Sequence, residues 1–160
     1  MYSFEELLKI GQYYSDAHNG SNIANNQLTF MDGFVPTAEE MELALLTTAK
    51  KSATAEIDSQ YESKRQTYLT SGSTMAMVYL LKAAEAKLYK ADPNSGSFPF
   101  LTASVEAGEA ESLGQAADRV LGLQGALIQI AANLEKERLS KKIAVANATT
   151  VAEVETILTT

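Results

Sequence analysis

The stretch LGQAADRVLGLQGALIQIAANL, residues 113–134, decides the fold class of this chain. Apolar residues recur in it every three or four positions, which places them along one face of an α-helix. The pattern predicts a helix from Ser112 to about Ala146. Gly122 and Gly125 lie inside it, and since each costs about 1 kcal/mol relative to Ala, we expect a second helix to approach closely there. The apolar stripe consists of Leu113, Ala116, Ala117, Val120, Leu123, Leu127, Ile130, Ala131 and Leu134.

Other helices are predicted from their first residues. Four positions carry Ser or Thr followed three residues later by Glu or Gln, a pattern that lets side chain and backbone cap each other at a helix start. These pairs are Ser3/Glu6, Thr37/Glu40, Ser112/Gln115 and Thr150/Glu153. With the apolar periodicity, they predict helices at about 3–16, 37–69, 73–90, 98–108, 112–146 and 151–158.

The helices predicted at 37–69 and 73–90 each carry an apolar stripe. In the helix at 37–69 a narrow stripe favours packing along a single neighbour, as in a coiled coil or a hairpin, and leaves apolar surface that we expect a second copy of the chain to cover. The turn between the two helices is predicted at Thr70–Ser73. The stripes consist of Leu46, Ala49, Ala53, Ile57, Tyr61 and Tyr68 in the first helix, and Met77, Leu81, Ala84 and Leu88 in the second.

Residues 19–35 differ from the rest because they are rich in Asn, Gly and Ser. Leu28 and Phe30 alternate with polar neighbours, which predicts a short strand or an extended arm. The predicted fold is therefore all-α, with two long antiparallel helical hairpins, short terminal helices and an irregular N-terminal arm. The predicted organisation is an N-terminal helix and attachment arm at 1–36 and a helical domain at 37–160.

Composition narrows the function. The formal net charge is −7; residues 1–60 hold nine acids and three bases, and residues 61–160 hold eleven acids and ten bases. An acidic chain without a basic stripe repels nucleic-acid backbones. There is no Cys, hence no disulfide framework. We expect no signal peptide, because the N-terminus lacks a basic and an apolar region, and no membrane span, because no apolar run approaches about 18 residues.

No set of residues predicts catalysis. His18, alone in a turn-like His-Asn-Gly, is interpreted as a surface residue, because a metal or catalytic role needs partners. Acid pairs such as Glu39 and Glu42 are interpreted as a solvated helix face, although carboxylates at that spacing can hold a divalent ion. We therefore expect no enzyme activity, no metal and no cofactor.

Several other side chains allow two interpretations. Arg65, Lys82 and Glu85 form either a partly buried network that fixes the turn at 70–73 or ordinary surface pairs. Phe98 and Phe100, around Pro99, form either an aromatic plug that docks a loop onto the helices or an exposed anchor for a partner.

Residues 60–157 resemble a segment of small tail-associated proteins of tailed bacteriophages and prophages. The resemblance rests on the order and spacing of several landmarks, none of them specific alone. They are Arg65, Tyr68-Leu69-Thr70, Met77-x-Tyr79-x-x-Lys82-x-x-Glu85-Ala86-x-x-Tyr89, Phe98-Pro99-Phe100-Leu101, Ala117-Asp118-x-Val120 and the run from Glu135 to Thr150. Departures occur around Glu111 and Gly114 and in the charged run 135–138.

The resemblance implies a non-enzymatic virion structural or assembly protein of the tail, tail fibre or baseplate, made in the host bacterial cytoplasm. It implies other virion proteins and further copies of the chain as partners, and no nucleic acid or membrane. The alternatives are a fibre-assembly chaperone, a head or neck accessory protein and, less favoured, an acidic nucleic-acid mimic. Residues 1–35 are the expected attachment segment, either through addition of Leu28–Phe30 to the edge of a partner's sheet or through packing of Phe4, Leu7 and Leu8 on a partner helix. Candidate partner-binding residues are Phe4, Leu7, Leu8, Leu28, Phe30, Phe34, Phe98 and Phe100.

Overall fold

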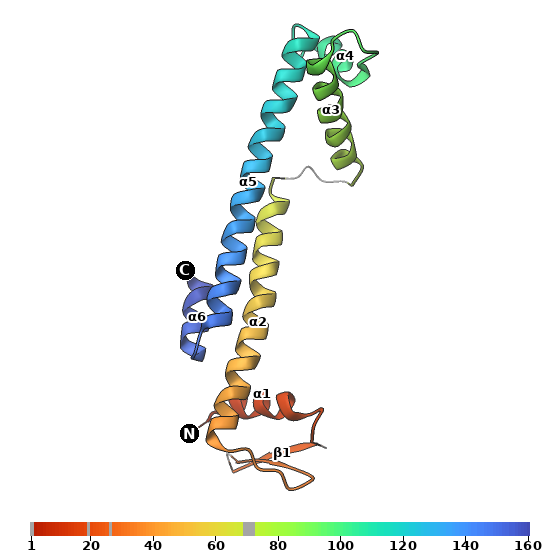
Figure 1. The fold of residues 1–160 in the computed structure, drawn as a ribbon. Coiled ribbons are helices and arrows are strands. Elements are labelled where there is room, and N and C mark those ends of the chain that lie inside the picture. The colour runs from red at the N-terminus through yellow and green to blue at the C-terminus, as the bar shows by residue number, and fades with distance from the viewer. Residues whose placement is uncertain (1, 19, 26, 69–72) are drawn as a thin grey trace. The chain divides into compact units, whose positions relative to one another are not determined.

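The computed structural model describes residues 2–18, 20–25, 27–68 and 73–160, apart from the side chains of residues 73 and 74. Within these ranges 72% of the residues are helical and a small two-stranded sheet is present, so the prediction of a mainly helical chain is confirmed. The elements in order are α1 (Phe4–Tyr14), β1 (Ser21–Ala24), β2 (Gln27–Phe30), α2 (Ala38–Gln66), α3 (Ser73–Ala91), α4 (Pro99–Glu106), α5 (Leu113–Asn147) and α6 (Val151–Thr159) (Figure 1).

The helix starts follow the predicted caps. Reciprocal capping boxes form at Ser3, Thr37 and Thr150. In each, the hydroxyl accepts the backbone N–H of the Glu three residues later, and the carboxylate of that Glu accepts the backbone N–H of the capping residue. At the fourth position the Gln115 amide N–H donates to the Ser112 hydroxyl at 3.2 Å. Here the Gln115 side chain instead accepts from the backbone N–H of Glu111. The cap therefore reaches one residue further back than the box pattern predicts.

The chain divides into two compact units, Met1–Gln60 with Arg138–Thr160, and Tyr61–Glu137. Helices α2 and α5 each contribute residues to both units. The division into 1–36 and 37–160 stays a prediction. Ala44, near the start of α2, is buried in one core with residues of α1 and β2.

In the first unit, α1 packs on a β-hairpin rather than on an irregular arm. The strands are antiparallel with Ser21 opposite Phe30 and Ala24 opposite Gln27. Asn25 adopts a φ of 51° in the turn, a conformation that Asn tolerates in tight hairpins. Of the two predicted alternatives the short strand is confirmed at β2, and the irregular arm is wrong over these residues, because the alternating Leu28 and Phe30 give β2 an apolar face that is buried. The core consists of Leu7, Ile10, Leu28, Phe30 and Ala44.

Charged residues connect α2 and the last part of α5 within the first unit. The Arg138 guanidinium and the Lys142 ammonium both donate to the Asp58 carboxylate, with 2.9 Å from Lys142 Nζ to Asp58 Oδ2. Nearer the end of α5, Lys50 Nζ donates to the backbone oxygen of Ala146 at 2.8 Å. The hydrogen bond from Lys142, and then that from Arg138, lowers the pKa of Asp58 below its ordinary value of 3.8.

The second unit is built around a core that we call the helical cap. It is made by the second half of α3, α4 and the first turns of α5, which come together in Figure 1. Its buried residues are Ala86, Phe98, Leu101, Ala110, Ala116 and Ala117. The Glu85 carboxylate on α3 accepts the backbone N–H of Leu101 at 2.8 Å. Because Phe98 has no side-chain group to cap α4, Glu85 supplies that cap from a neighbouring helix.

We predict that Leu101→Ala will lower the free energy of unfolding by about 2–5 kcal/mol, because it removes a fully buried side chain and leaves a cavity. Leu101 is 0% exposed. The matched control is Leu43→Ala in α2, where the side chain is exposed and a change within about 0.5 kcal/mol is expected. Urea unfolding followed by circular dichroism measures both. Equal effects of the two substitutions would contradict the assignment of the helical cap.

We predict that Asp58→Asn will lower the melting temperature near neutral pH and that this difference will disappear in acid. The pKa of Asp58 is lower in the folded state than its ordinary value. The ion pairs therefore contribute their full stabilisation at a pH above the ordinary pKa, and this stabilisation is lost as the pH falls through the folded-state pKa. Thermal melts of both proteins from about pH 7 to about pH 2 test this. Asp16→Asn is the control, since no side-chain partner of Asp16 is found within the described ranges. A difference that stayed constant with pH would rule out this role.

Candidate interaction surface

Helix α3 turns its most apolar stripe away from the helical cap. The stripe predicted from the sequence, Met77, Leu81, Ala84 and Leu88, is exposed along its length; the three large side chains are 64%, 48% and 61% exposed. Leu80, on the same side, is exposed as well. We call these five residues the α3 stripe. The sequence periodicity identifies this face correctly, and in the structure the face lies in solvent.

The opposite side of α3 makes the internal contacts. Ala83 and Ala86 are buried, and Tyr89 packs edge-on against Phe98 with ring centroids 5.1 Å apart. The small Ala side chains let α3 lie close to α4 and α5, and the Glu85 carboxylate caps the first turn of α4. The helix therefore has one face of small residues that holds the fold and one face of large residues that does not.

The middle of α5 is also exposed and uncharged. From Val120 to Leu134 the sequence contains no charged residue, and Leu123 and Ile128 are more than half exposed. Among the described residues, no atom from elsewhere in the chain lies within 4 Å of a Cβ placed at Gly122 or Gly125. The predicted close helix approach at these glycines is therefore absent among the described residues, and a sterically open, uncharged helical surface lies there instead.

The eight candidate partner-binding residues fall into three groups. Leu7, Leu28, Phe30 and Phe98 are buried in the two cores, so their apolar surface is used within the chain. Phe34 and Phe100 are half-buried. Phe4 and Leu8 are exposed and lie one turn apart on α1. Phe98 follows the plug interpretation, because it docks on Tyr89.

Of the two interpretations of Arg65, Lys82 and Glu85, the shared network that would fix the turn at 70–73 is not found among the described residues. Lys82 lies 3.8 Å from Glu109, and Arg65 pairs with Glu62 and Glu135. Glu85 caps α4. Each of the three side chains therefore has a different partner within the unit. Residues 69–72, which hold most of that turn, lie outside the described residues.

His18 is part of an aromatic cluster rather than a plain surface residue. Its ring stacks on Phe34 with centroids 4.0 Å apart and planes 1° from parallel. Its Nδ1 lies 2.7 Å from Asp32 Oδ2, and 23% of its side chain is exposed. Tyr14 and Phe30 complete the cluster. The hydrogen bond with His18, and then that from the Phe34 N–H, lowers the pKa of Asp32. The aromatic residues at 13–14 and 30–34 were the signal in the sequence for this cluster.

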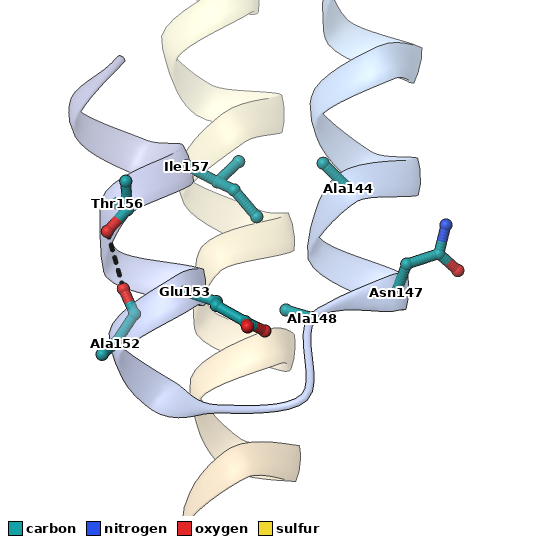
Figure 2. Close-up of a pocket in the computed structure, with 7 residues that line it drawn as sticks. All are labelled: Ala144, Asn147, Ala148, Ala152, Glu153, Thr156 and Ile157. Atoms are coloured by element: carbon teal, nitrogen blue, oxygen red, sulfur yellow. Dashed lines mark hydrogen bonds between the residues drawn. The ribbon is translucent and has the colours of Figure 1, made fainter.

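A hollow of about 510 Å³ lies between the end of α5 and α6. Figure 2 shows its lining residues, with the Thr156 hydroxyl donating to the backbone oxygen of Ala152 at 2.8 Å. The Glu153 carboxylate accepts the N–H groups of Thr149 and Thr150, and the first of these hydrogen bonds is the main cause of its lowered pKa. Both polar groups thus serve the local helix. The lining residues are Ala144, Asn147, Ala148, Ala152, Glu153, Thr156 and Ile157.

The described residues contain no group of three or more His, Cys, Asp or Glu side chains placed to hold a metal ion. In the same ranges, every helix is too short or too polar to cross a membrane.

Comparison with known proteins gives no family for this chain. No protein-family model, no curated protein and no solved structure matches it.

We predict that His18→Phe will raise the pKa of Asp32 toward its ordinary value of 3.8, because the ring that stacks on Phe34 is kept while the hydrogen bond to the carboxylate is lost. Carboxyl carbon shifts followed by NMR through an acid titration measure this. The pKa of Glu153 is the internal control and should stay lowered, since its causes lie at Thr149 and Thr150. An unchanged Asp32 titration would remove His18 from the explanation.

Proposed function

We propose that this chain is a non-enzymatic structural or assembly protein of a bacteriophage tail, tail fibre or baseplate, acting through protein–protein contacts. The observation that carries the proposal is the α3 stripe, which places large apolar side chains in solvent on a helix already fixed by its other face. Contiguous exposed apolar surface marks interaction sites in soluble proteins. The resemblance of residues 60–157 to tail-associated proteins supplies the biological setting.

The proposed arrangement is two long antiparallel helical hairpins. In the first unit the contacts pair Lys50 with Ala146 and Asp58 with Lys142. The partner's number falls along α5 as the number rises along α2, which is the order expected of antiparallel helices. In the second unit α3 and the start of α5 share the helical cap. These contacts support the hairpins without involving any placement of one unit on the other.

The proposed partners are other virion proteins and further copies of this chain, in the tail of the particle, after synthesis in the host bacterial cytoplasm. No cofactor, nucleic acid or membrane takes part in the proposed role. For attachment through the N-terminal unit, exposure favours Phe4 and Leu8 over the buried Leu28 and Phe30. Because Ala53 and Ile57 of α2 are buried, the exposed stripe of α3, and not that of α2, is the proposed contact between copies of the chain.

Two other assignments remain alternatives to a tail structural role. A fibre-assembly chaperone would use the same exposed apolar surface transiently and would be absent from finished particles. A head or neck accessory protein would be present, but in the copy number of that part of the particle. The exposed stripe supports both as protein-binding roles, and only the location of the chain separates them.

We expect mass spectrometry of purified particles from the source phage to find this chain at a fixed ratio to a known tail component, because symmetric assemblies hold each component in a defined copy number. Particles stripped of tails are the control and should lack it. Detection in the lysate of infected cells but never in particles would overturn the structural role in favour of the chaperone. Detection in tail-less heads would overturn it in favour of the accessory protein.

The same particles test the attachment face. A phage carrying Phe4→Gln and Leu8→Gln should incorporate fewer copies, while Met31→Gln, at a side chain that is 86% exposed in the same unit, should leave incorporation unchanged. Normal incorporation of the double variant would exclude the α1 face.

A further inference from the structure

The backbone of strand β1 directs hydrogen-bonding groups away from the hairpin. The N–H of Met31 donates to the backbone oxygen of Gly20 at 3.2 Å, and in an antiparallel ladder only every second residue pair exchanges such bonds. The register places Ser21 and Ile23 at the positions between the bonded pairs. Their N–H and C=O groups therefore point away from β2 and form the outer edge of β1.

The two outer edges of the hairpin differ. On β2, the N–H of Phe30 donates to the backbone oxygen of Phe34 at 3.3 Å, and the backbone oxygen of Phe30 accepts the N–H of Gly33 at 3.0 Å. On β1, the outward backbone groups of Ser21 and Ile23 have no partner among the described residues. The hairpin thus has one edge that its own chain covers and one edge that is open.

The sequence of β1 does not guard the open edge. Soluble proteins protect edge strands with charged side chains, especially Lys, or with Pro. Ser21–Ala24 contains neither, and three of its four residues are exposed. An unguarded edge of this kind can take up an extended strand of another protein.

One side of α1 gives the open edge an apolar flank. Gly11 lies over β1, because a Cβ placed on it would come within 2.9 Å of the Ser21 hydroxyl oxygen. Phe4 and Leu8 stand seven and three residues before Gly11, which puts all three on the same side of the helix. Both side chains are exposed. The edge and its flank belong to the same unit, so the site does not depend on how the second unit is placed.

The charge of this part of the chain indicates the composition of the strand that fits it. Residues 1–37 hold four acids, which are Glu5, Glu6, Asp16 and Asp32, and one base, Lys9. The Lys9 ammonium pairs with Glu5 at 3.0 Å, so the excess charge is negative. Because opposite charges attract across an interface, a basic strand is favoured over an acidic one.

We propose that the open edge of β1 binds an extended, basic strand of a partner protein, whose alternate apolar side chains lie against Phe4 and Leu8. The inference rests on the proposed function in taking these two residues as the attachment face, and it names the kind of segment that this face receives. Backbone hydrogen bonds to Ser21 and Ile23 hold the strand. Strand pairing with a partner is thus proposed at β1 and not at Leu28–Phe30.

The geometry of an added antiparallel strand agrees with this flank. Residues that lie directly opposite each other in neighbouring strands have side chains on the same face of the sheet. The Ser21 side chain is on the α1 side, so the strand residues opposite Ser21 and Ile23 also direct their side chains toward α1. The same residues of the added strand therefore supply both the hydrogen bonds and the apolar contacts.

The first experiment uses a fluorescent peptide of alternating Lys and Val as the probe and measures its anisotropy with the full chain. Saturable binding is expected, with a dissociation constant on the order of 10–100 µM, because the edge is short. The matched peptide has methylated Val nitrogens, which keeps side chains and charge but removes the pairing N–H groups, and it should not bind. Equal binding of both peptides would show charge attraction alone and would overturn strand pairing.

A peptide of alternating Glu and Val tests the charge. It should bind at least about tenfold more weakly than the Lys peptide, since it meets an acidic surface. Equal or tighter binding of the Glu peptide would exclude a basic partner.

The second experiment changes the edge itself. Ile23→Pro removes an N–H that points outward and leaves the bonds between β1 and β2 in place, so the Lys peptide should bind about tenfold more weakly. Ile23→Ala is the matched control, because it shortens the same side chain but keeps the N–H, and it should bind like the unmodified chain. Circular dichroism checks that both variants are folded. Unchanged binding by a folded Ile23→Pro variant would contradict the proposal.

The flank gives a second test that does not touch the strand. Leu8→Gln should weaken peptide binding about fivefold through lost apolar contact, whereas Met31→Gln, on the exposed side chain after β2, should not change it. If Leu8→Gln binds as tightly as the unmodified chain, the α1 flank is not part of the site.

Pairing between two copies of β1 is the competing occupant. Analytical ultracentrifugation of the full chain at the concentrations of the peptide assay should show that Ile23→Pro does not change its oligomeric state. An oligomer that Ile23→Pro dissociates would replace the basic partner strand with a second copy.

This inference and the proposed function fail separately. Loss of peptide binding leaves the presence of the chain in tail particles untouched. Absence of the chain from particles leaves the binding of a basic strand at β1 untouched.

Discussion

The burial of Ala86 on α3 is the contact on which the second unit depends. Ala86 shares a core with Leu101 of α4 and with Ala116 and Ala117 of α5. The small side chains of the three Ala residues let the helices approach closely. Because this face of α3 is held against α4 and α5, the opposite face lies toward solvent. The exposed stripe is thus a consequence of the internal packing and not of a loosely held helix.

An exposed stripe of this kind has a physical cost. Burying apolar surface contributes roughly 25 cal/mol per Å², so Met77, Leu80, Leu81 and Leu88 leave stabilisation unrealised in a single chain. The same holds for Leu123 and Ile128 on the uncharged middle of α5. Scattered exposed apolar residues are common on protein surfaces, but Met77, Leu81 and Leu88 lie in one row along α3, and contiguous apolar surface of this kind marks interaction sites.

The charged groups of the chain are mostly committed to its own architecture. Asp58 joins α2 to α5 through Lys142 and Arg138, and Glu85 caps α4. Asp32 holds His18 beside Phe34. Carboxylates used in this way lower their pKa by accepting hydrogen bonds in the ionised form, and the described shifts of Asp32 and Asp58 have that cause. Both shifts have a structural cause, namely the hydrogen bonds that join Asp58 to α5 and Asp32 to His18 and Phe34.

The sequence by itself determined the helices, because their signals are local. The caps at Ser3, Thr37 and Thr150 and the three-to-four-residue periodicity depend only on neighbours within a turn. It also marked the correct stripe on α3 and the alternation of Leu28 and Phe30. Only the tertiary structure decided which surfaces are covered. Strand β2 forms a sheet because Ser21–Ala24 pairs with it, and the Glu85 carboxylate accepts the N–H of Leu101, 16 residues away. Periodicity shows that a helix has an apolar face but not what lies against it, because burial depends on contacts between residues distant in the chain. For that reason the exposure of the Met77, Leu81 and Leu88 face of α3 could be seen only in the tertiary structure.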